Sequence, residues 1–281
     1  MMWVIWMNLP KAARYAFPAV VLALAVVGAP GAAAQDEDES LPDRFVLKLG
    51  GYNVLDSSTE LFLSRTNTLG TRIDFERDLG GEDTVNTPRV EGYFRFNDRH
   101  RVEFRAFQTE RTGSRRLART IQFGDRTFTV ESKVDSRIQN DFYKLAYAYS
   151  FYHVPKVELS VSAGVEVMDF EAELEDTTGA VSEKTATTAP MPVFGFRMDY
   201  SVTPRLTVRV NTETFYIEYD DFVRGSLIEL EAGLDYRLFR NFGLGASLSR
   251  LALDVNIDDD GENTDVTDLY RGAYVYGLLY F

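Results

Sequence analysis

Apolar and polar residues alternate along most of the chain from Arg44 onward, with the period of two that is typical of β-strands with two different faces. In four places an alternating segment rich in aromatic residues ends at a short polar turn, and a second alternating segment leaves that turn. The sequence predicts these hairpins at residues 89–107, 142–167, 192–216 and 228–248. With an opening strand at 44–53 and a closing strand at 272–281, we expect about ten antiparallel strands.

The connections between the predicted strands alternate between short and long. Each hairpin turns within a few residues, whereas the segments between hairpins are rich in Asp, Glu, Thr, Ser and Gly. These long polar segments are residues 56–88, 111–141, 171–189, 218–225 and 256–268. Outer-membrane barrels have this asymmetry, with short periplasmic turns and longer extracellular loops. Residues 59–80 contain alternating pieces that extend the first hairpin or add strands, so about eight or twelve strands are alternatives to ten.

The first 34 residues have the composition of a secretory signal peptide. An apolar run at 15–27 follows two basic residues, and an Ala-x-Ala pattern predicts cleavage before Gln35. A membrane anchor is less favoured, because the run is too short to span a bilayer comfortably. After the signal peptide at 1–34 we expect a disordered acidic lead-in at 35–43 and a barrel domain at 44–281.

The net charge restricts the possible partners and the possible form in a membrane. The whole chain carries a formal charge of −13, and loss of the signal peptide with Lys11 and Arg14 makes the mature chain −15. This argues against nucleic acid as a partner, because binding to it needs a basic surface. No run after residue 34 is apolar over the length that a spanning helix needs, so a membrane form must be a closed barrel. The sequence therefore predicts an all-β fold, a single antiparallel up-and-down transmembrane β-barrel.

The two faces of the predicted strands differ in chemistry. One face is apolar, and we expect it to contact lipid, with aromatic residues at the strand ends near the headgroups. The other face is charged and is expected to line the lumen. The candidate lumen residues are Arg89, Glu91, Arg95, Glu103, Arg105, Lys144, Glu158, Glu166, Arg197, Asp199, Arg209, Glu213, Glu229, Glu231, Asp235 and Arg237. A secreted lipocalin-like barrel, with its apolar face inside, is the alternative.

Acidic groups outnumber basic groups among these candidates, and two functional hypotheses follow. In a narrow barrel, buried charges must be paired or hydrated, and paired side chains fill the lumen. The favoured hypothesis is therefore a barrel with a structural or surface-interaction role and a polar lumen closed by ion pairs. The alternative is a narrow porin-like channel for ions or small solutes, with a preference for cations.

The sequence contains no pattern that predicts a catalytic, cofactor or metal site. The chain has no Cys, and His100 and His153 lie in short turns without a Ser nucleophile and an acidic partner placed around them. An outer-membrane lipid-modifying enzyme is therefore the least favoured class. Residues 256–261 resemble the first half of a calcium loop, but Thr267 stands at the position where a bidentate Glu is needed.

One of the long polar segments is basic, in contrast to the acidic chain as a whole. It contains Arg115, Arg116, Arg119 and Arg126. These side chains could contact lipopolysaccharide phosphates, and a solvated loop is the simpler interpretation.

The end of the chain, residues 274–281, reads Tyr-Val-Tyr-Gly-Leu-Leu-Tyr-Phe. Together with the signal peptide and the alternating strands with aromatic ends, it resembles the small OmpA-like and OmpW-like outer-membrane β-barrels of proteobacteria. The resemblance implies a Gram-negative outer membrane, contact with outer-membrane lipid and lipopolysaccharide, and insertion by the barrel-assembly machinery. It also implies an assembly signal at Tyr276, Leu279 and Phe281, with Gly277 where a larger apolar residue is usual. We expect a monomer, and the resemblance implies nothing about a substrate.

Overall fold

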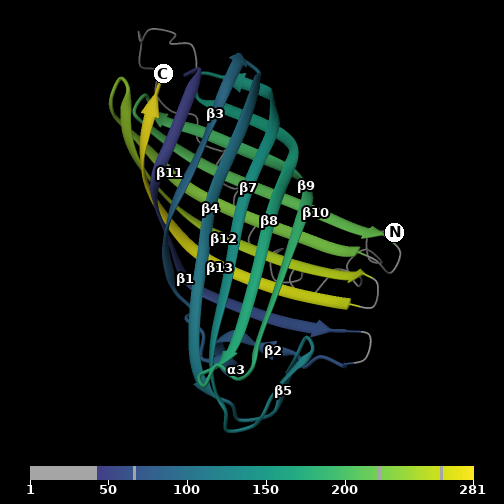
Figure 1. Cartoon of the computed structure of the whole chain (residues 1–281). Coiled ribbons are helices and arrows are strands. Elements are labelled where there is room, and N and C mark those ends of the chain that lie inside the picture. The colour runs from purple at the N-terminus through teal and green to yellow at the C-terminus, as the bar shows by residue number, and fades with distance from the viewer. Residues whose placement is uncertain (1–42, 66–67, 220–222, 260–261) are drawn as a thin grey trace, which may run out of the picture.

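Ten long antiparallel strands form a single sheet that closes into a ring (Figure 1). The structure is a computed structural model that describes residues 43–65, 68–219, 223–259 and 262–281. The strands of the ring are β1 (Phe45–Ser64), β3 (Val85–Asn97), β4 (His100–Arg116), β7 (Lys133–Val154), β8 (Val157–Asp176), β9 (Ser182–Thr203), β10 (Leu206–Tyr219), β11 (Val223–Phe239), β12 (Phe242–Asp259) and β13 (Glu262–Tyr280). Each pairs with its neighbours along the chain, and β1 pairs with β13 to close the ring. The predicted all-β, up-and-down barrel of about ten strands is confirmed.

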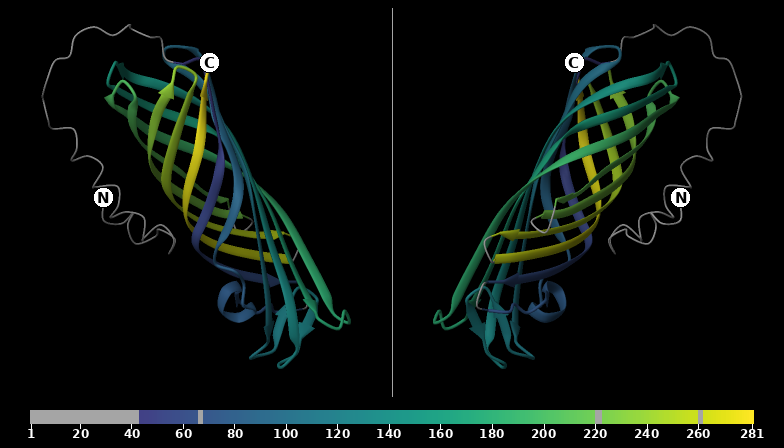
Figure 2. Two further views of the ribbon diagram at one scale, coloured as in Figure 1. Left: turned by 90° about the vertical axis from the view of Figure 1, so that its left-hand side faces the viewer. Right: turned by 90° about the vertical axis from the view of Figure 1, so that its right-hand side faces the viewer.

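The two ends of the barrel differ in the length of their connections. Four short turns lie at one end, the short-turn end, together with Arg44 and Phe281 (Figure 2). There the Arg44 N–H donates to the Phe281 carbonyl over 2.9 Å. The opposite end carries the longer connections and is called the long-loop end. The signal peptide predicted at 1–34 and nearly all of the lead-in predicted at 35–43 lie outside the described residues.

The connection from β1 to β3 carries a short helix, α3 (Phe75–Leu79), which follows the two-residue β2 (Ile73–Asp74). Asp74 begins the helix, because its side chain accepts a hydrogen bond from the Arg77 N–H over 2.7 Å. Gly80 ends it in the left-handed conformation, with a φ of 68°. The described residues between 59 and 80 therefore form the end of β1 and a small insert, and they add no long strands to the ring. In the described part of the chain, no helix is long and apolar enough to span a membrane.

Four of the five segments that the sequence predicts as loops, 111–141, 171–189, 218–225 and 256–268, are largely strand in the described part of the chain. Both β4 and β7 run into the first segment, and β8 and β9 run through most of the second. Inward side chains such as Ile138 and Leu174 are apolar and buried there, while the outward side chains are polar. The alternation thus continues, but acidic and hydroxyl residues on the outward face give these segments the composition of loops.

An apolar belt surrounds the half of the barrel next to the short-turn end. Leu145, Phe194, Leu248 and Val275 point outward from four different strands and are between 60% and 65% exposed. A continuous apolar surface of this kind marks contact with an apolar partner. The apolar face of the strands is therefore the outer face, which contradicts the lipocalin-like alternative.

The belt ends at a row of polar side chains. Gln108, Asp141, Asp169 and Thr188 are paired with one another across β4, β7, β8 and β9. On β7, Tyr143 is the last apolar outward residue before this row. The belt is about nine residues tall, which is the length of strand that crosses a bilayer at the usual barrel tilt.

The ring divides into two parts, at the level of this row on β4 and six residues before it on β9. The pairing of β9 with β10 extends no farther than Phe194 and Thr214, and that of β3 with β4 no farther than Arg89 and Phe107. From there β4, β7, β8 and β9 continue as a four-stranded sheet, which Figure 2 shows projecting at the long-loop end. We call this sheet the extended wall.

Two prolines mark the place where β9 leaves β10. The Ser201 N–H donates to the Lys156 carbonyl, and the register of β8 and β9 continues unbroken from there. Odd-numbered residues of β9 therefore turn their backbone groups to β8, and even-numbered residues turn theirs to the β10 side. Pro190 and Pro192 thus place a nitrogen without hydrogen on the edge that β10 has left. Prolines at such an edge remove donors that would otherwise pair with another chain.

The pairing of β1 with β13, which we call the seam, provides a test of ring closure. A Cβ atom on Gly50 would lie 2.0 Å from the Val275 carbonyl oxygen, whereas one on Gly51 would meet nothing closer than 3.4 Å. We expect Gly50→Ala to lower the free energy of unfolding by about 1–3 kcal/mol, because the backbone of the seam must shift. Gly51→Ala is the matched control and should cost less than about 0.5 kcal/mol. Urea unfolding in detergent measures both variants, and equal stabilities would contradict the tight seam.

Candidate functional site

The interior of the barrel near the short-turn end is filled with charged side chains. The candidate lumen residues that are buried there are Arg89, Arg95, Glu103, Arg105, Glu166, Glu213, Glu229, Glu231 and Asp235. Those with side chains no more than 16% exposed are Glu91, Lys144, Glu158, Arg197, Asp199 and Arg209. Arg237 differs, because it lies at the rim of the short-turn end and pairs with Asp43. The structure thus brings all but one of the candidates together inside the ring.

Arg105 on β4 is the centre of one group of contacts. Its guanidinium lies 2.6 Å from a Glu229 oxygen, 2.8 Å from Glu166 and 3.5 Å from Glu213. Lys144 on the neighbouring strand β7 provides a second cation for Glu213. These side chains come from β4, β7, β8, β10 and β11, so the group spans the interior from one side of the ring to the other.

A second group lies closer to the short-turn end. Arg101 contacts Glu103 over 2.7 Å and Glu158 over 2.6 Å, and Arg95 contacts the same Glu158 over 3.0 Å. Arg197 on β9 lies 3.5 Å from Glu103, so it joins this group to the opposite wall. Every carboxylate in the group therefore has at least one guanidinium within ion-pair distance.

A third group joins the remaining strands. Arg209 on β10 contacts Asp235 over 2.5 Å and also lies 2.8 Å from Asp199, which belongs to the second group through Arg197. On the other side of the interior, Arg89 contacts Glu231 over 2.7 Å. Arg89 and Lys48 also share Glu91, over 2.6 Å and 3.0 Å. The interior charges form a network that touches nearly every strand of the ring.

Lys48 and Arg101 belong to this network but are absent from the residues that the sequence analysis selected. Both are at most 3% exposed. Arg101 has the parity of Glu103 and Arg105 on β4, so the alternation could have identified it. With these two residues, and without Arg237 at the rim, the network has eight basic side chains and nine carboxylates. The excess of acidic groups among the predicted residues, nine against seven, is therefore reduced to a single group, because Lys48 and Arg101 were missing from the basic residues.

Tyrosines of β13 cover the ionic network on one side. Tyr274 donates a hydrogen bond to the Arg89 carbonyl over 2.9 Å, and its ring lies 4.8 Å from the Arg89 guanidinium. Tyr276 donates to Asp235 over 2.6 Å and is buried. Leu279 and Phe281, the other residues of the predicted assembly signal, have the opposite parity, and Phe281 is exposed on the outer face. The three predicted signal residues thus lie on two faces of β13.

Apolar side chains fill the next level of the interior towards the long-loop end. Those that are at most 5% exposed include Phe142, Met168, Met191, Val193, Phe215, Leu227 and Leu253. They separate the ionic network from a second polar group. Such an apolar layer excludes water from the middle of the barrel.

The second polar group surrounds Arg111, which is fully buried. Its guanidinium contacts Glu76 of α3 over 2.7 Å and lies 3.9 Å from Asp268, which is also fully buried. The Thr59 hydroxyl donates to Asp268 over 2.5 Å, and the Thr59 N–H donates to Glu76 over 3.0 Å. Burial raises the pKa of the Glu76 carboxyl, although the Thr59 N–H and the Arg111 guanidinium oppose this rise. Glu76 therefore fastens α3 to the strands of the ring.

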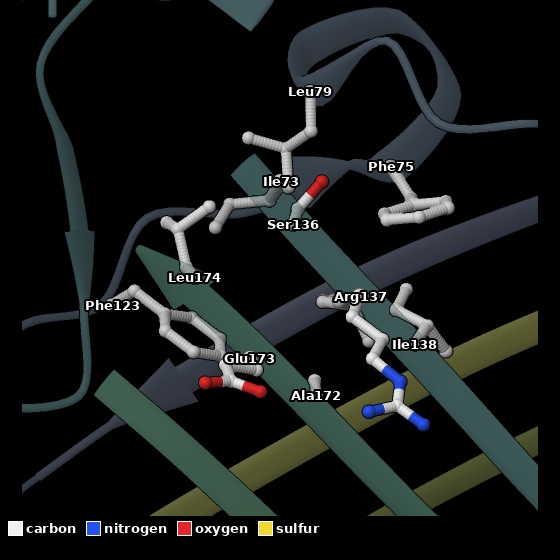
Figure 3. Close-up of a pocket in the computed structure, with 11 residues that line it drawn as sticks. Ile73, Phe75, Leu79, Phe123, Ser136, Arg137, Ile138, Ala172, Glu173 and Leu174 are labelled. Carbon is white, nitrogen blue, oxygen red and sulfur yellow. The ribbon is translucent and has the colours of Figure 1, made fainter. Parts of the chain in front are cut away.

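A cap covers the long-loop end on the inner side of the extended wall. It consists of β2, α3 and the hairpin of β5 (Ile121–Phe123) and β6 (Arg126–Phe128). Figure 3 shows Phe75 and Leu79 of α3, with Phe123, directed towards Ile138 and Leu174 of the wall. These side chains enclose a cavity of only about 10 Å³, which holds no more than one water molecule. The cap is thus packed against the wall as a small apolar core.

The two histidines lie at the short-turn end, away from the cap. His100 contacts the Tyr147 hydroxyl, and His153 lies 3.5 Å from Glu158. The Ser150 hydroxyl also donates to Glu158. Here the carboxylate stands between the serine and the histidine, so the imidazole cannot take the serine proton directly as in a hydrolase triad.

Among the described residues, no group of three or more His, Cys, Asp and Glu side chains has the arrangement of a metal site.

Several solved structures of bacterial outer-membrane proteins resemble this chain. The outer-membrane protease OmpT of Escherichia coli matches with a TM-score of 0.52 at 6% identity, over 86% of this chain and 99% of that chain. The attachment invasion locus protein Ail of Yersinia pestis has a TM-score of 0.37 at 12% identity, over 84% of this chain and 99% of that chain. The outer-membrane protein OprG of Pseudomonas aeruginosa has a TM-score of 0.41 at 11% identity, over 85% of this chain and 95% of that chain.

No protein-family model and no curated protein matches the sequence. At such low identities a structural likeness shows the fold alone, and the likeness to OmpT carries that conclusion. The chain therefore has the fold of the bacterial outer-membrane β-barrels, the class that the sequence analysis predicted.

Proposed function

We propose that this chain is an outer-membrane β-barrel whose lumen is closed by ion pairs and whose function is a structural or surface-interaction role at the long-loop end. The observation that carries the proposal is the burial of paired charges across the whole interior. Arg101, Arg111 and Glu166 are at most 1% exposed, so water does not reach them. The apolar layer and the cap add two further closures along the same path.

The apolar belt supports a location in a membrane. Its height of about nine residues suits a bilayer, and the charged groups lie on the inner face, as in a transmembrane barrel. In a Gram-negative outer membrane the belt contacts lipid, and the polar row with Asp141 and Asp169 lies at the level of the lipopolysaccharide headgroups. Insertion by the barrel-assembly machinery and a monomeric state belong to the same proposal.

The balance of charges weighs against a cation channel. Each of the nine carboxylates of the network lies within ion-pair distance of one or more of its eight basic side chains, and a channel selective for cations needs carboxylates that are free to bind them. The fold is compatible with catalysis, since OmpT is a protease. Here the histidines lie at the short-turn end, and the interior carboxylates are held by guanidiniums. The proposed role is therefore non-enzymatic.

Single-channel recording in a planar bilayer tests whether the lumen is closed. We expect the full mature chain to insert without reproducible openings, because paired side chains leave no continuous water path. A porin added to the same bilayer serves as the control for insertion and for the sensitivity of the recording. Reproducible openings of the wild-type protein would contradict a closed lumen and favour the porin-like hypothesis.

Replacement of Arg105 tests the energetic role of the network. Arg105→Met removes the cation that Glu166, Glu213 and Glu229 share, so we expect the free energy of unfolding to fall by about 3–5 kcal/mol. Arg137→Met is the matched control, because Arg137 forms an exposed ion pair with Glu110. The control should cost less than about 1 kcal/mol. Equal losses in urea unfolding would mean that the interior charges are hydrated rather than paired.

Replacement of Phe281 tests the predicted assembly signal. Phe281→Ala keeps the main-chain bonds with residues 44 and 45, so it removes only an exposed ring. We expect a several-fold lower amount of folded barrel in the outer-membrane fraction, measured by gel mobility with and without boiling. Phe239→Ala is the control, since Phe239 lies at the same end and is similarly exposed, 70% against 65%. An unchanged amount of folded Phe281→Ala protein would count against the signal.

A further inference from the structure

Three arginines of the cap and the extended wall form an exposed group, which we call the arginine cluster. It consists of Arg77 on α3, Arg115 near the end of β4 and Arg119 just after β4. The Arg77 and Arg119 side chains are 75% and 51% exposed, and Arg115 is also exposed. They are joined to one another through the helix, because Arg115 donates to the Arg77 carbonyl and Arg119 contacts Asp78 over 2.7 Å.

The carboxylates that accompany the cluster lie beneath it. Asp74 and Asp78 are 18% and 17% exposed, far less than the arginines that contact them. Asp74 already caps the N-terminus of α3, and Asp78 accepts a hydrogen bond from the Asp74 N–H. The surface that meets solvent is therefore formed by guanidinium groups, with two carboxylates behind three cations.

Arg115 and Arg119 also have structural roles. These roles occupy only some of the N–H donors of each side chain. Arg115 satisfies a carbonyl in the last turn of α3, and Arg119 satisfies the Arg72 carbonyl. The contacts of Arg115 and Arg119 with described residues all come from a single terminal nitrogen of each side chain. Because a guanidinium has five N–H donors in a planar fork, the others remain able to bind an anion in bidentate geometry.

The opposite face of the extended wall has the opposite charge. An open groove of about 550 Å³ lies there, and its charged lining residues are Glu82, Asp135, Glu173, Glu175 and the single basic residue Arg137. Arg116 follows Arg115 in the chain but turns to this other face, because side chains alternate along β4. A negatively charged partner is therefore attracted to the cap side of the wall and repelled from the other side.

The distance of the cluster from the apolar belt argues against the lipid headgroups as its ligand. Arg115 stands nine residues beyond Ala106, the last apolar outward residue of β4, which corresponds to roughly 30 Å along the strand. The cluster is also exposed and shallow, so a single small anion would gain little there in water. A chain of anionic groups gains more, because several guanidiniums are engaged at once.

We propose that the arginine cluster of Arg77, Arg115 and Arg119 binds a polyanionic chain that carries sulfate or phosphate esters. This inference deepens the proposed surface-interaction role and rests on it. The ligand chemistry follows from the guanidinium fork, which matches the oxygen atoms of sulfate and phosphate groups. The chain as a whole is acidic, with a formal net charge of −13, so an overall basic charge does not account for binding and a local basic surface is required.

Binding to dextran sulfate tests the inference on the purified mature protein in detergent. We expect binding to immobilised dextran sulfate, no binding to uncharged dextran, and weaker binding as the salt concentration rises. Free dextran sulfate and polyphosphate as competitors compare sulfate groups with phosphate groups, and the stronger competitor identifies the preferred group. The combined Arg77→Gln, Arg115→Gln and Arg119→Gln variant should bind at least about tenfold more weakly, because three charge-assisted contacts are lost.

Matched variants separate a local effect from a change of net charge. Arg99→Gln, Arg205→Gln and Arg240→Gln combine three exposed arginines of the short-turn end, and this variant should bind like the wild type. Arg116→Gln, compared with Arg115→Gln, tests the two faces of β4 at adjacent positions. Lysine at the three cluster positions should retain binding better than glutamine, which distinguishes charge from support of the cap. Gel mobility without boiling verifies that each variant is folded.

The experiments test this inference and the proposed function separately. No binding of the wild-type protein to either polyanion, or an equal loss in the short-turn-end variant, would overturn the arginine cluster as a binding surface. The assay is done in detergent and depends neither on the membrane nor on a closed lumen. Channel openings in a bilayer would therefore overturn the proposed function and leave a positive binding result unchanged.

Discussion

The pairing of β1 with β13 is the constraint on which the rest of the structure depends. It joins the first and last strands along nearly their whole length, from Val46 opposite Tyr280 to Ser64 opposite Asn263. A ring without edges satisfies the backbone hydrogen bonds within the sheet itself, which is the condition for an apolar surrounding. It also gives every strand one inward and one outward face, so a single period of two separates lipid-facing from interior side chains. The close approach at Gly50 shows how little space this seam leaves.

Closure of the ring also places many charges where water is scarce. Buried ions cost several kcal/mol each unless they are paired and hydrogen-bonded, so the interior is stable only as a network. Arg105 with its three carboxylates and Arg101 with two show this arrangement. The network replaces a hydrophobic core, because the apolar side chains are needed on the outer face. It joins strands that are distant in sequence, and its side chains fill the interior near the short-turn end.

The distribution of apolar and polar side chains is reversed at the long-loop end, because the strands there extend past the apolar belt. The extended wall has polar residues outside and apolar residues inside, which is the pattern of a soluble sheet. The cap of α3 and the β5–β6 hairpin covers its inner face, and Glu76 ties the cap to the buried Arg111. The edge that β9 presents after β10 departs carries Pro190 and Pro192, which limits pairing with other chains. The molecule thus combines a barrel with its apolar face outward and a small domain with its apolar face inward.

The sequence by itself determined the alternating strands and the chemistry of their two faces, and it predicted about ten strands with eight or twelve as alternatives. These features depend on local alternation and on turn residues, which any stretch of chain displays without its partners. Even so, Lys48 and Arg101 were missed, because one basic residue in an apolar strand and one beside a turn give weak local signals. The extended wall was mistaken for loops, since glutamates and threonines on one face hide the apolar residues of the other.

Only the tertiary structure decided which charges meet and which surfaces remain open. The partners of Arg105 come from strands far apart in the chain, and their distances depend on the shear and closure of the ring. The arginine cluster likewise depends on a turn of α3 that brings Arg77 next to Arg115, although 38 residues separate them. Alternation fixes the face on which a side chain lies, whereas its contacts across the barrel depend on register and closure, which no local pattern encodes.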